Sequence, residues 1–246
     1  MSGHSHWATI RRKKDVVDAK KGKIFSKLAR SIMAIARQGG GDPASNIRLK
    51  ALLDEARACR MPKENIDRAI KKGTGELEGA TLEEIVYEAY GPGGAAIMMD
   101  ILTDNRNRTA SELRKIIETH GGTLAGSGAV SWLFNKKGLI AVLQSAAPED
   151  KLFELVVEAG AEDMEKVGET YQITCQPADF EAVRQAIEKA SIPIESAQIT
   201  KLPSTTVQLD EDNGAKILKL MDALDDHDDI QNVYSNFELP PSLMSE

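Results

Sequence analysis

The spacing of apolar residues changes character near residue 80. Before that point apolar side chains recur every three or four residues, which is the period of a helix. Beyond it, short apolar runs of strand length alternate with helical stretches. Residues 74–80 contain Gly75 and Gly79 and are expected to form a linker between the two parts. The chain is therefore predicted to begin with helices and to continue with α/β structure.

The helical part is expected to contain three helices, at residues 15–38, 45–59 and 62–73. The first ends at the sequence Gly-Gly-Gly-Asp-Pro, which cannot continue a helix, and Pro62 suits the first turn of the third. In the first helix the apolar side chains share one sector of a helical wheel. We therefore expect a small three-helix domain over residues 1–75, preceded within those bounds by an arm at 1–14.

The α/β part shows the order of two small sandwiches. Its expected elements are strands at 85–90 and 95–102, a helix at 109–120, a strand at 129–134, strands and helices in the order βαββαβ over 139–201, a strand at 205–209, a helix at 212–225 and a strand at 230–237. The Thr109 and Glu112 pair reads as a capping box for the helix at 109–120.

The βαββαβ order is that of a ferredoxin-like domain, predicted over 138–202. The flanking segments 82–135 and 204–240 are each half a domain, and together they complete a second sandwich. A serial arrangement would leave the last helix and strand without a sheet. We therefore expect an α+β protein with an N-terminal three-helix domain and two ferredoxin-like α/β domains, one inserted into the other.

Charge divides the chain at nearly the same place. Residues 1–75 carry 18 Lys and Arg against 7 Asp and Glu, a net charge of +11, whereas residues 76–246 carry 13 against 31, a net charge of −18. A strongly basic segment on an acidic protein points to a polyanionic partner. The alternative is an ordinary solvated basic surface.

Three groups of side chains suit a nucleic acid. An arm with histidines, a tryptophan and a basic run can stack on bases and contact phosphates. Cations of the first helix lie opposite its apolar sector, and two arginines stand beside the expected start of the helix at 109–120, where free amides favour an anion. The candidate nucleic-acid-binding residues are His4, His6, Trp7, Arg11, Arg12, Lys13, Lys14, Lys20, Lys23, Lys27, Arg30, Arg106 and Arg108.

Each group also has a structural interpretation. The arm could be a disordered, solvated segment whose Trp7 packs against the bundle. The basic helices could dock onto an acidic protein partner or onto the acidic domains of this chain itself. The loop at 103–109 could be a turn held by its own Asp and Asn side chains.

No catalytic or metal-binding constellation emerges from the sequence. The four histidines are scattered, and the acidic residues around His227 do not follow the spacing of a calcium loop. We expect no enzyme activity, no metal and no cofactor. No apolar run approaches the roughly 20 residues that cross a bilayer, no signal peptide is apparent, and the two cysteines are isolated, so we expect a cytoplasmic protein.

Several motifs together resemble the YebC family over nearly the whole chain. Two positions depart from the family pattern, because His6 stands where lysine is usual and Ala89 where glycine is usual. The motifs are Gly-His-Ser-His-Trp at 3–7, Asp-Ala-Lys-Lys-Gly-Lys at 18–23 with Phe25, the Gly-Gly-Gly-Asp-Pro loop, Tyr87-Glu88 with Gly-Pro-Gly-Gly, Asp-Asn-Arg-Asn-Arg-Thr at 104–109 and Val-Tyr-Ser-Asn at 233–236.

The resemblance implies a three-domain fold and a role in gene expression. Members are commonly described as DNA-binding transcriptional regulators, one is a mitochondrial translational activator, and bacterial members are linked to ribosomes translating proline-rich stretches. The expected function is that of a nonenzymatic DNA-binding transcriptional regulator. The alternative is a translation factor bound to ribosomal RNA or tRNA. Neither involves a membrane or a small-molecule substrate, and the sequence does not define an oligomeric state.

Overall fold

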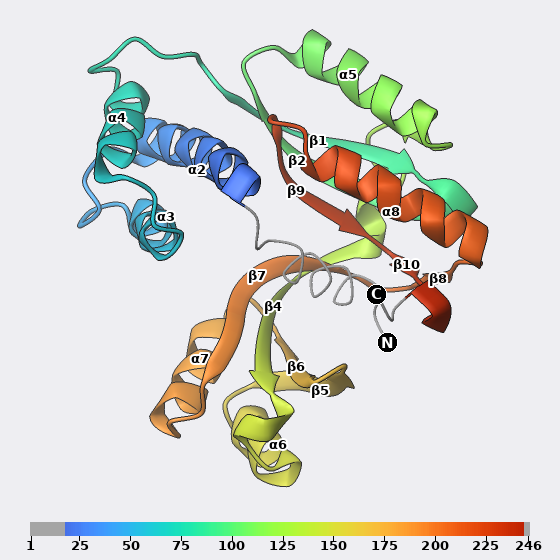
Figure 1. The fold of residues 1–246 in the computed structure, drawn as a ribbon. Coiled ribbons are helices and arrows are strands. Elements are labelled where there is room, and N and C mark those ends of the chain that lie inside the picture. Colours follow the sequence, from blue (N-terminus) through green and yellow to red (C-terminus); the bar gives the residue numbers. More distant parts are fainter. Residues whose placement is uncertain (1–17, 244–246) are drawn as a thin grey trace.

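The computed structural model describes residues 18–243, and their side chains from Gly22 onward (Figure 1). Its first part is a bundle of α2 (Asp18–Gly39), α3 (Ile47–Ala58) and α4 (Lys63–Thr74). Gly22 does not interrupt α2. Aliphatic side chains fill the bundle core, including Leu28, Ile32, Leu49, Leu53 and Ile66.

Close packing in the bundle depends on one glycine. A Cβ atom at Gly73 in α4 would lie 2.5 Å from the backbone oxygen of Met33 in α2. The two helices therefore meet almost backbone to backbone, which excludes any larger residue at this position.

The first α/β unit is a four-stranded antiparallel sheet in the order β3-β1-β2-β9. Its strands are β1 (Glu83–Tyr90), β2 (Ala96–Thr103), β3 (Thr123–Ala125) and β9 (Ile230–Ser235). Helices α5 (Arg106–Thr119) and α8 (Glu211–Asp225) cover one face and form the largest core with it (Figure 1). The expected strand at 205–209 shortens to β8 (Val207–Gln208), which pairs with β10 (Phe237–Glu238) outside this sheet.

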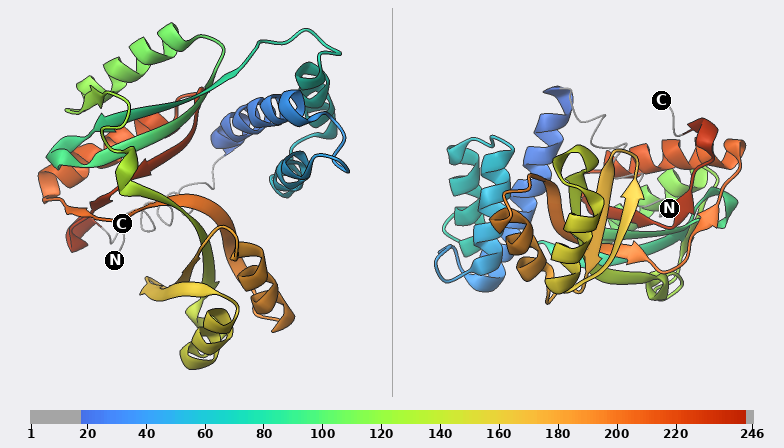
Figure 2. Two further views of the ribbon diagram at one scale, coloured as in Figure 1. Left: turned by 180° about the vertical axis from the view of Figure 1, so that it is seen from behind. Right: turned by 90° about the horizontal axis from the view of Figure 1, so that it is seen from below.

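The second α/β unit lies between β3 and β9 in the chain. Its strands have the spatial order β5-β6-β4-β7, which is the ferredoxin-like order for a βαββαβ unit. The elements are β4 (Phe134–Leu143), α6 (Glu149–Glu158), β5 (Ala161–Val167), β6 (Thr170–Cys175), α7 (Phe180–Lys189) and β7 (Ile194–Pro203). Figure 2 shows both helices of this unit on the same side of its sheet. The predicted α+β class, with one α/β unit inserted into the other, is confirmed. The numerical domain bounds remain a prediction.

The expected strand at 129–134 is wrong. Residues Ser131–Leu133 form a 3-10 turn, and the missing strand of the first sheet is β3. The cause is Glu88, whose buried carboxylate accepts hydrogen bonds from the backbone N–H groups of Gly128, Val130 and Ser131 at 2.7, 2.6 and 2.9 Å. Those donors are then unavailable to a strand ladder. Burial raises the pKa of Glu88, but the three backbone bonds outweigh it, so the pKa lies below its ordinary value.

The expected capping box at Thr109 is also wrong. Helix α5 begins three residues earlier, with Asn105 as its cap, and the Asn105 Oδ1 accepts the backbone N–H of Arg108 at 3.1 Å. The side chains of Thr109 and Glu112 instead contact residues near the start of β9. Residues more than 100 positions away in the sequence therefore bind the two side chains that the local pattern assigned to a helix cap.

Candidate nucleic-acid interface

Much of the predicted interface precedes the described residues. His4, His6, Trp7, Arg11, Arg12, Lys13 and Lys14 all lie outside the described part of the chain. Lys20 belongs to α2, but its side chain also lies outside that part. The structure therefore places the remaining candidates, Lys23, Lys27, Arg30, Arg106 and Arg108.

The cationic face of α2 lies against the first α/β unit. Lys23 Nζ is 2.9 Å from a carboxylate oxygen of Asp226, and Lys27 Nζ donates to the backbone oxygen of Asp225 at 2.7 Å. Lys27 also pairs with the Asp225 carboxylate at 3.4 Å, with both side chains at least three-quarters buried. At the other end of α2, the Gln38 amide donates to Glu84 of β1 at 3.0 Å. The contacts between α2 and this unit are therefore largely polar and charged.

Asp229 is the centre of these contacts. Its side chain is 1% exposed, and its carboxylate pairs with Arg30 of α2 and with Arg108 of α5, the latter at 2.8 Å. The hydroxyl of Thr109 donates to it at 2.7 Å and that of Thr103 at 3.2 Å. Burial raises the pKa of Asp229, but the hydrogen bonds from Arg108, Thr109 and Arg30 outweigh it and hold the pKa well below its ordinary value.

Two predicted basic groups are thus brought together, but around a carboxylate of the same chain. Arg30 comes from the cationic face of α2, and Arg108 comes from the loop and helix start at 104–109. Both side chains bind Asp229. The cationic face of α2 does point away from the core of the bundle, as predicted. It contacts the acidic end of α8 and the turn that follows α8. A phosphate at Lys27 or Arg30 would compete with Asp225 or Asp229 for the same cation. Docking onto the chain's own acidic domain is the arrangement that these contacts form.

Arg106 differs from Arg108. Its side chain is exposed, and within residues 18–243 it forms no ion pair. Other exposed cations on α3 and α4 were not singled out from the sequence, although the same helical-wheel argument would have found them; they include Arg48, Lys50, Lys63, Arg68 and Lys71. Arg60, between the two helices, is a further exposed cation.

One group near this junction has the composition of a metal site. Ligand atoms of Glu112, His227 and Asp229 lie within 4.8 Å of one another. The His227 Nδ1, however, accepts the backbone N–H of Asp229 at 3.1 Å, and its Nε2 faces Glu112 at 3.0 Å. Asp229 is already bound by two arginines. Hydrogen bonds within the protein account for this cluster, so it offers no ligand set for a cation.

We expect the charge reversal Lys27→Glu to release the bundle from the first α/β unit. It would set a carboxylate beside Asp225. The repulsion should shift the equilibrium between the docked and the released bundle by about 2 kcal/mol toward release. Small-angle scattering should show a larger radius of gyration, and adding Asp225→Lys should reverse the increase. The control is Lys50→Glu, which makes the same charge change at an exposed position of α3. Equal radii for the Lys27 and Lys50 variants would contradict this role.

Comparison with known proteins identifies the lineage of the chain. Residues 5–76 match the model of the TACO1/YebC protein N-terminal domain, and residues 82–237 match that of the TACO1/YebC second and third domain. The chain belongs to the TACO1/YebC family.

Relatives of this TACO1/YebC chain match it over their full length. A probable transcriptional regulatory protein of Pelotomaculum thermopropionicum is 54% identical, over 97% of this chain and 99% of the relative. Another protein so named, from Geobacter sulfurreducens, is 53% identical over 100% and 99%. The crystal structure of a conserved hypothetical protein from Aquifex aeolicus has a TM-score of 0.81 and 47% identity, covering 93% of this chain and 95% of that one.

The resemblance to the YebC family is therefore confirmed. Two of the TACO1/YebC motifs that carried it have structural roles here. Glu88 holds the loop before β4, while Asn105 caps α5 and Arg108 binds Asp229. These motifs do not by themselves mark a surface for nucleic acid.

Proposed function

We propose that this protein is a nonenzymatic nucleic-acid-binding regulator of gene expression that acts on DNA as a transcriptional regulator. The observation that carries the proposal is the charge division, +11 over residues 1–75 against −18 over the rest. Membership of a family whose relatives are named probable transcriptional regulatory proteins supports a regulatory role. A polyanion is the partner that a basic segment of this density attracts.

The contacts within the chain divide the predicted residues into two groups. Lys27, Arg30 and Arg108 have carboxylate partners, and we propose that they hold the bundle in place. Lys23 pairs at the edge of the junction and remains 44% exposed. The proposed nucleic-acid contacts are therefore the arm residues together with Lys20, Lys23 and Arg106.

We also propose that the protein works in the cytoplasm. Cys59 and Cys175 are both free thiols, as expected in a reducing compartment. Within residues 18–243, no helix combines the length and apolar character needed to cross a membrane.

One observation favours RNA as a second candidate target. Among the described residues, helices cover only one face of the first sheet. Four-stranded sheets with an open face serve as RNA-binding surfaces in other folds. A translation factor bound to ribosomal RNA or tRNA is therefore the alternative proposal.

Sedimentation of a cell lysate through a sucrose gradient separates the two targets. A transcriptional regulator should remain at the top of the gradient after DNase treatment. Co-migration with ribosomes that survives DNase and is lost after RNase would contradict the DNA proposal and support the translational one.

A further inference from the structure

The free face of the first sheet is only partly covered. Side chains alternate along a strand, so Val86, Met98 and Asp100 point away from α5 and α8. One half of this face is covered by a small apolar cluster that includes Met98, Val130 and Tyr234. On the other half, Val86 remains 46% exposed.

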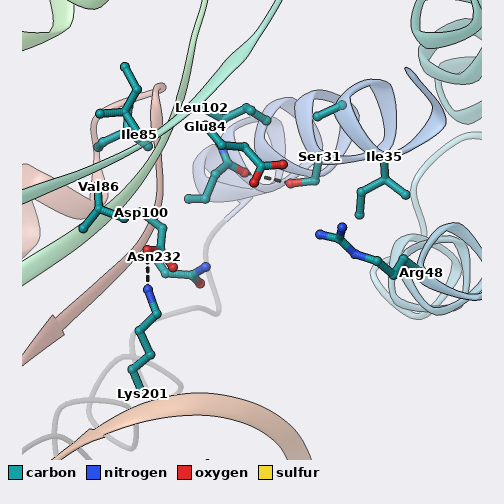
Figure 3. Close-up of a pocket in the computed structure, with 13 residues that line it drawn as sticks. Ser31, Ile35, Arg48, Glu84, Ile85, Val86, Asp100, Leu102, Lys201 and Asn232 are labelled. Atoms are coloured by element: carbon teal, nitrogen blue, oxygen red, sulfur yellow. Dashed lines mark hydrogen bonds and ion pairs between the residues drawn. The ribbon is translucent and has the colours of Figure 1, made fainter. Parts of the chain in front are cut away.

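The uncovered half forms the floor of a cleft of about 510 Å³ where the three structural units meet (Figure 3). Ile35 of α2 and Arg48 of α3 line one side, and Lys201 of β7 lines the other. Asn232 of β9 lies beside the Asp100–Lys201 pair. A volume in this range is that of a small-molecule pocket, so the cleft can take one residue of a larger ligand.

Charges in the cleft are already compensated. Lys201 Nζ pairs with Asp100 at 2.6 Å, and the hydroxyl of Tyr234 donates to the other Asp100 oxygen at 3.0 Å. Glu84 accepts from Gln38, whose amide oxygen in turn accepts from Arg48 at 3.3 Å. The lining is therefore neutral overall, which favours a neutral polar ligand over a phosphate.

Two amide side chains supply the unused hydrogen-bonding capacity. The oxygen of Gln231 accepts from Ser31 at 2.9 Å, but its buried Nε2 has no acceptor within residues 18–243. The exposed Asn232 side chain adds a donor and an acceptor. Amides of this kind pair with the edges of nucleobases, and aliphatic side chains pack against their faces.

We propose that this cleft binds one unstacked nucleobase of a single-stranded nucleic acid. Val86 and Ile35 pack against the base, Gln231 and Asn232 meet its edge, and Arg48 at the rim lies toward the backbone. A duplex keeps its bases stacked inside, so it cannot deliver one to a cleft of this size without extruding it. The inference rests on the proposed nucleic-acid binding and adds a separate contact, made at the cleft and to single strands alone.

Fluorescence anisotropy of the full chain with labelled oligonucleotides tests the inference. The probes are a single-stranded RNA, the single-stranded DNA of the same sequence, and the DNA duplex, so that the ribose and the strand number are varied separately. Val86→Asp and Asn232→Ala should each weaken single-strand binding about fivefold or more while leaving duplex binding unchanged. The controls are Val157→Asp on α6, where Val157 is 45% exposed, and Asn135→Ala on β4, and neither position lines the cleft.

The outcomes separate this inference from the proposed function. Wild-type binding that the cleft variants leave unchanged overturns the cleft and leaves the proposed function standing. A wild-type chain that binds none of the three probes overturns both. Photo-crosslinking of a 4-thiouridine RNA should label peptides containing Val86 or Asn232, and labelling confined to the arm would also overturn the cleft.

Discussion

Replacing Asp229 by asparagine should lower the free energy of unfolding by about 3 kcal/mol. Asp229 is buried and pairs with Arg30 and Arg108. An amide would leave Arg30 without its carboxylate partner, and Arg108 would keep only Asp104 at 3.0 Å and the more distant Glu112. The loss should fall at the lower end of the range for buried ion pairs because the two arginine side chains are 27% and 41% exposed and can be partly rehydrated. Urea unfolding followed by circular dichroism measures the difference.

The neighbouring residue provides the control. Asp228 is exposed and forms no ion pair within the described residues, so Asp228→Asn should change stability by less than about 0.5 kcal/mol. Equal effects of the two substitutions would contradict the central role given to Asp229.

The Asp229 contribution should also depend on pH in a defined direction. Its folded pKa lies below the unfolded value of about 3.9, so on acidification the unfolded chain takes up the proton first. The stability difference between the wild type and Asp229→Asn should therefore be constant through neutral and weakly acidic pH. It should shrink as the pH falls below about 4 toward the folded pKa. A difference that shrank near neutral pH would contradict this assignment.

Neutralising the arm should have the largest effect on nucleic-acid binding. We expect the quadruple variant Arg11→Gln, Arg12→Gln, Lys13→Gln, Lys14→Gln to lose about two to three orders of magnitude in duplex affinity near physiological salt. Each phosphate contact contributes about 0.9 to the slope of log affinity against log salt, so the slope should fall by about 3 to 4. Anisotropy titrations across a salt series measure both quantities.

A variant with the same net charge distinguishes the arm from general attraction. Replacing Arg60, Lys63, Arg68 and Lys71 by glutamine removes four exposed cations from the bundle and leaves the arm intact. This control should retain most of the affinity and the salt slope. An arm variant with the wild-type slope would contradict phosphate contact by the arm.

Most elements of the fold could be predicted because each is encoded by its own period. The helix expected at 15–38 is observed from Asp18 to Gly39, and the βαββαβ order from 139 to 201 is found as β4 to β7. Glycines and prolines mark the ends of these segments because few other residues allow or enforce such turns. Even the inserted arrangement followed from the need to complete a sheet.

The two wrong elements, the strand at 129–134 and the cap at Thr109, share one kind of physical cause, because in each case a carboxylate binds hydrogen-bond donors from a distant part of the chain. Glu88 accepts the backbone donors of the loop before β4, and a 3-10 turn forms where a strand was expected. Asp229 accepts the hydroxyl of Thr109, and the helix start moves to Asn105. Local propensity cannot register a partner 40 or 120 residues away.

The sequence by itself determined that this chain has a basic helical part and an acidic α/β part, and which face of α2 carries the cations. Only the tertiary structure decided what those cations meet. Lys27 and Arg30 find Asp225 and Asp229 some 200 residues later in the chain, once β9 has joined the first sheet. Charge is a property of composition, but the partner of a charge depends on which surfaces folding brings within a few ångströms.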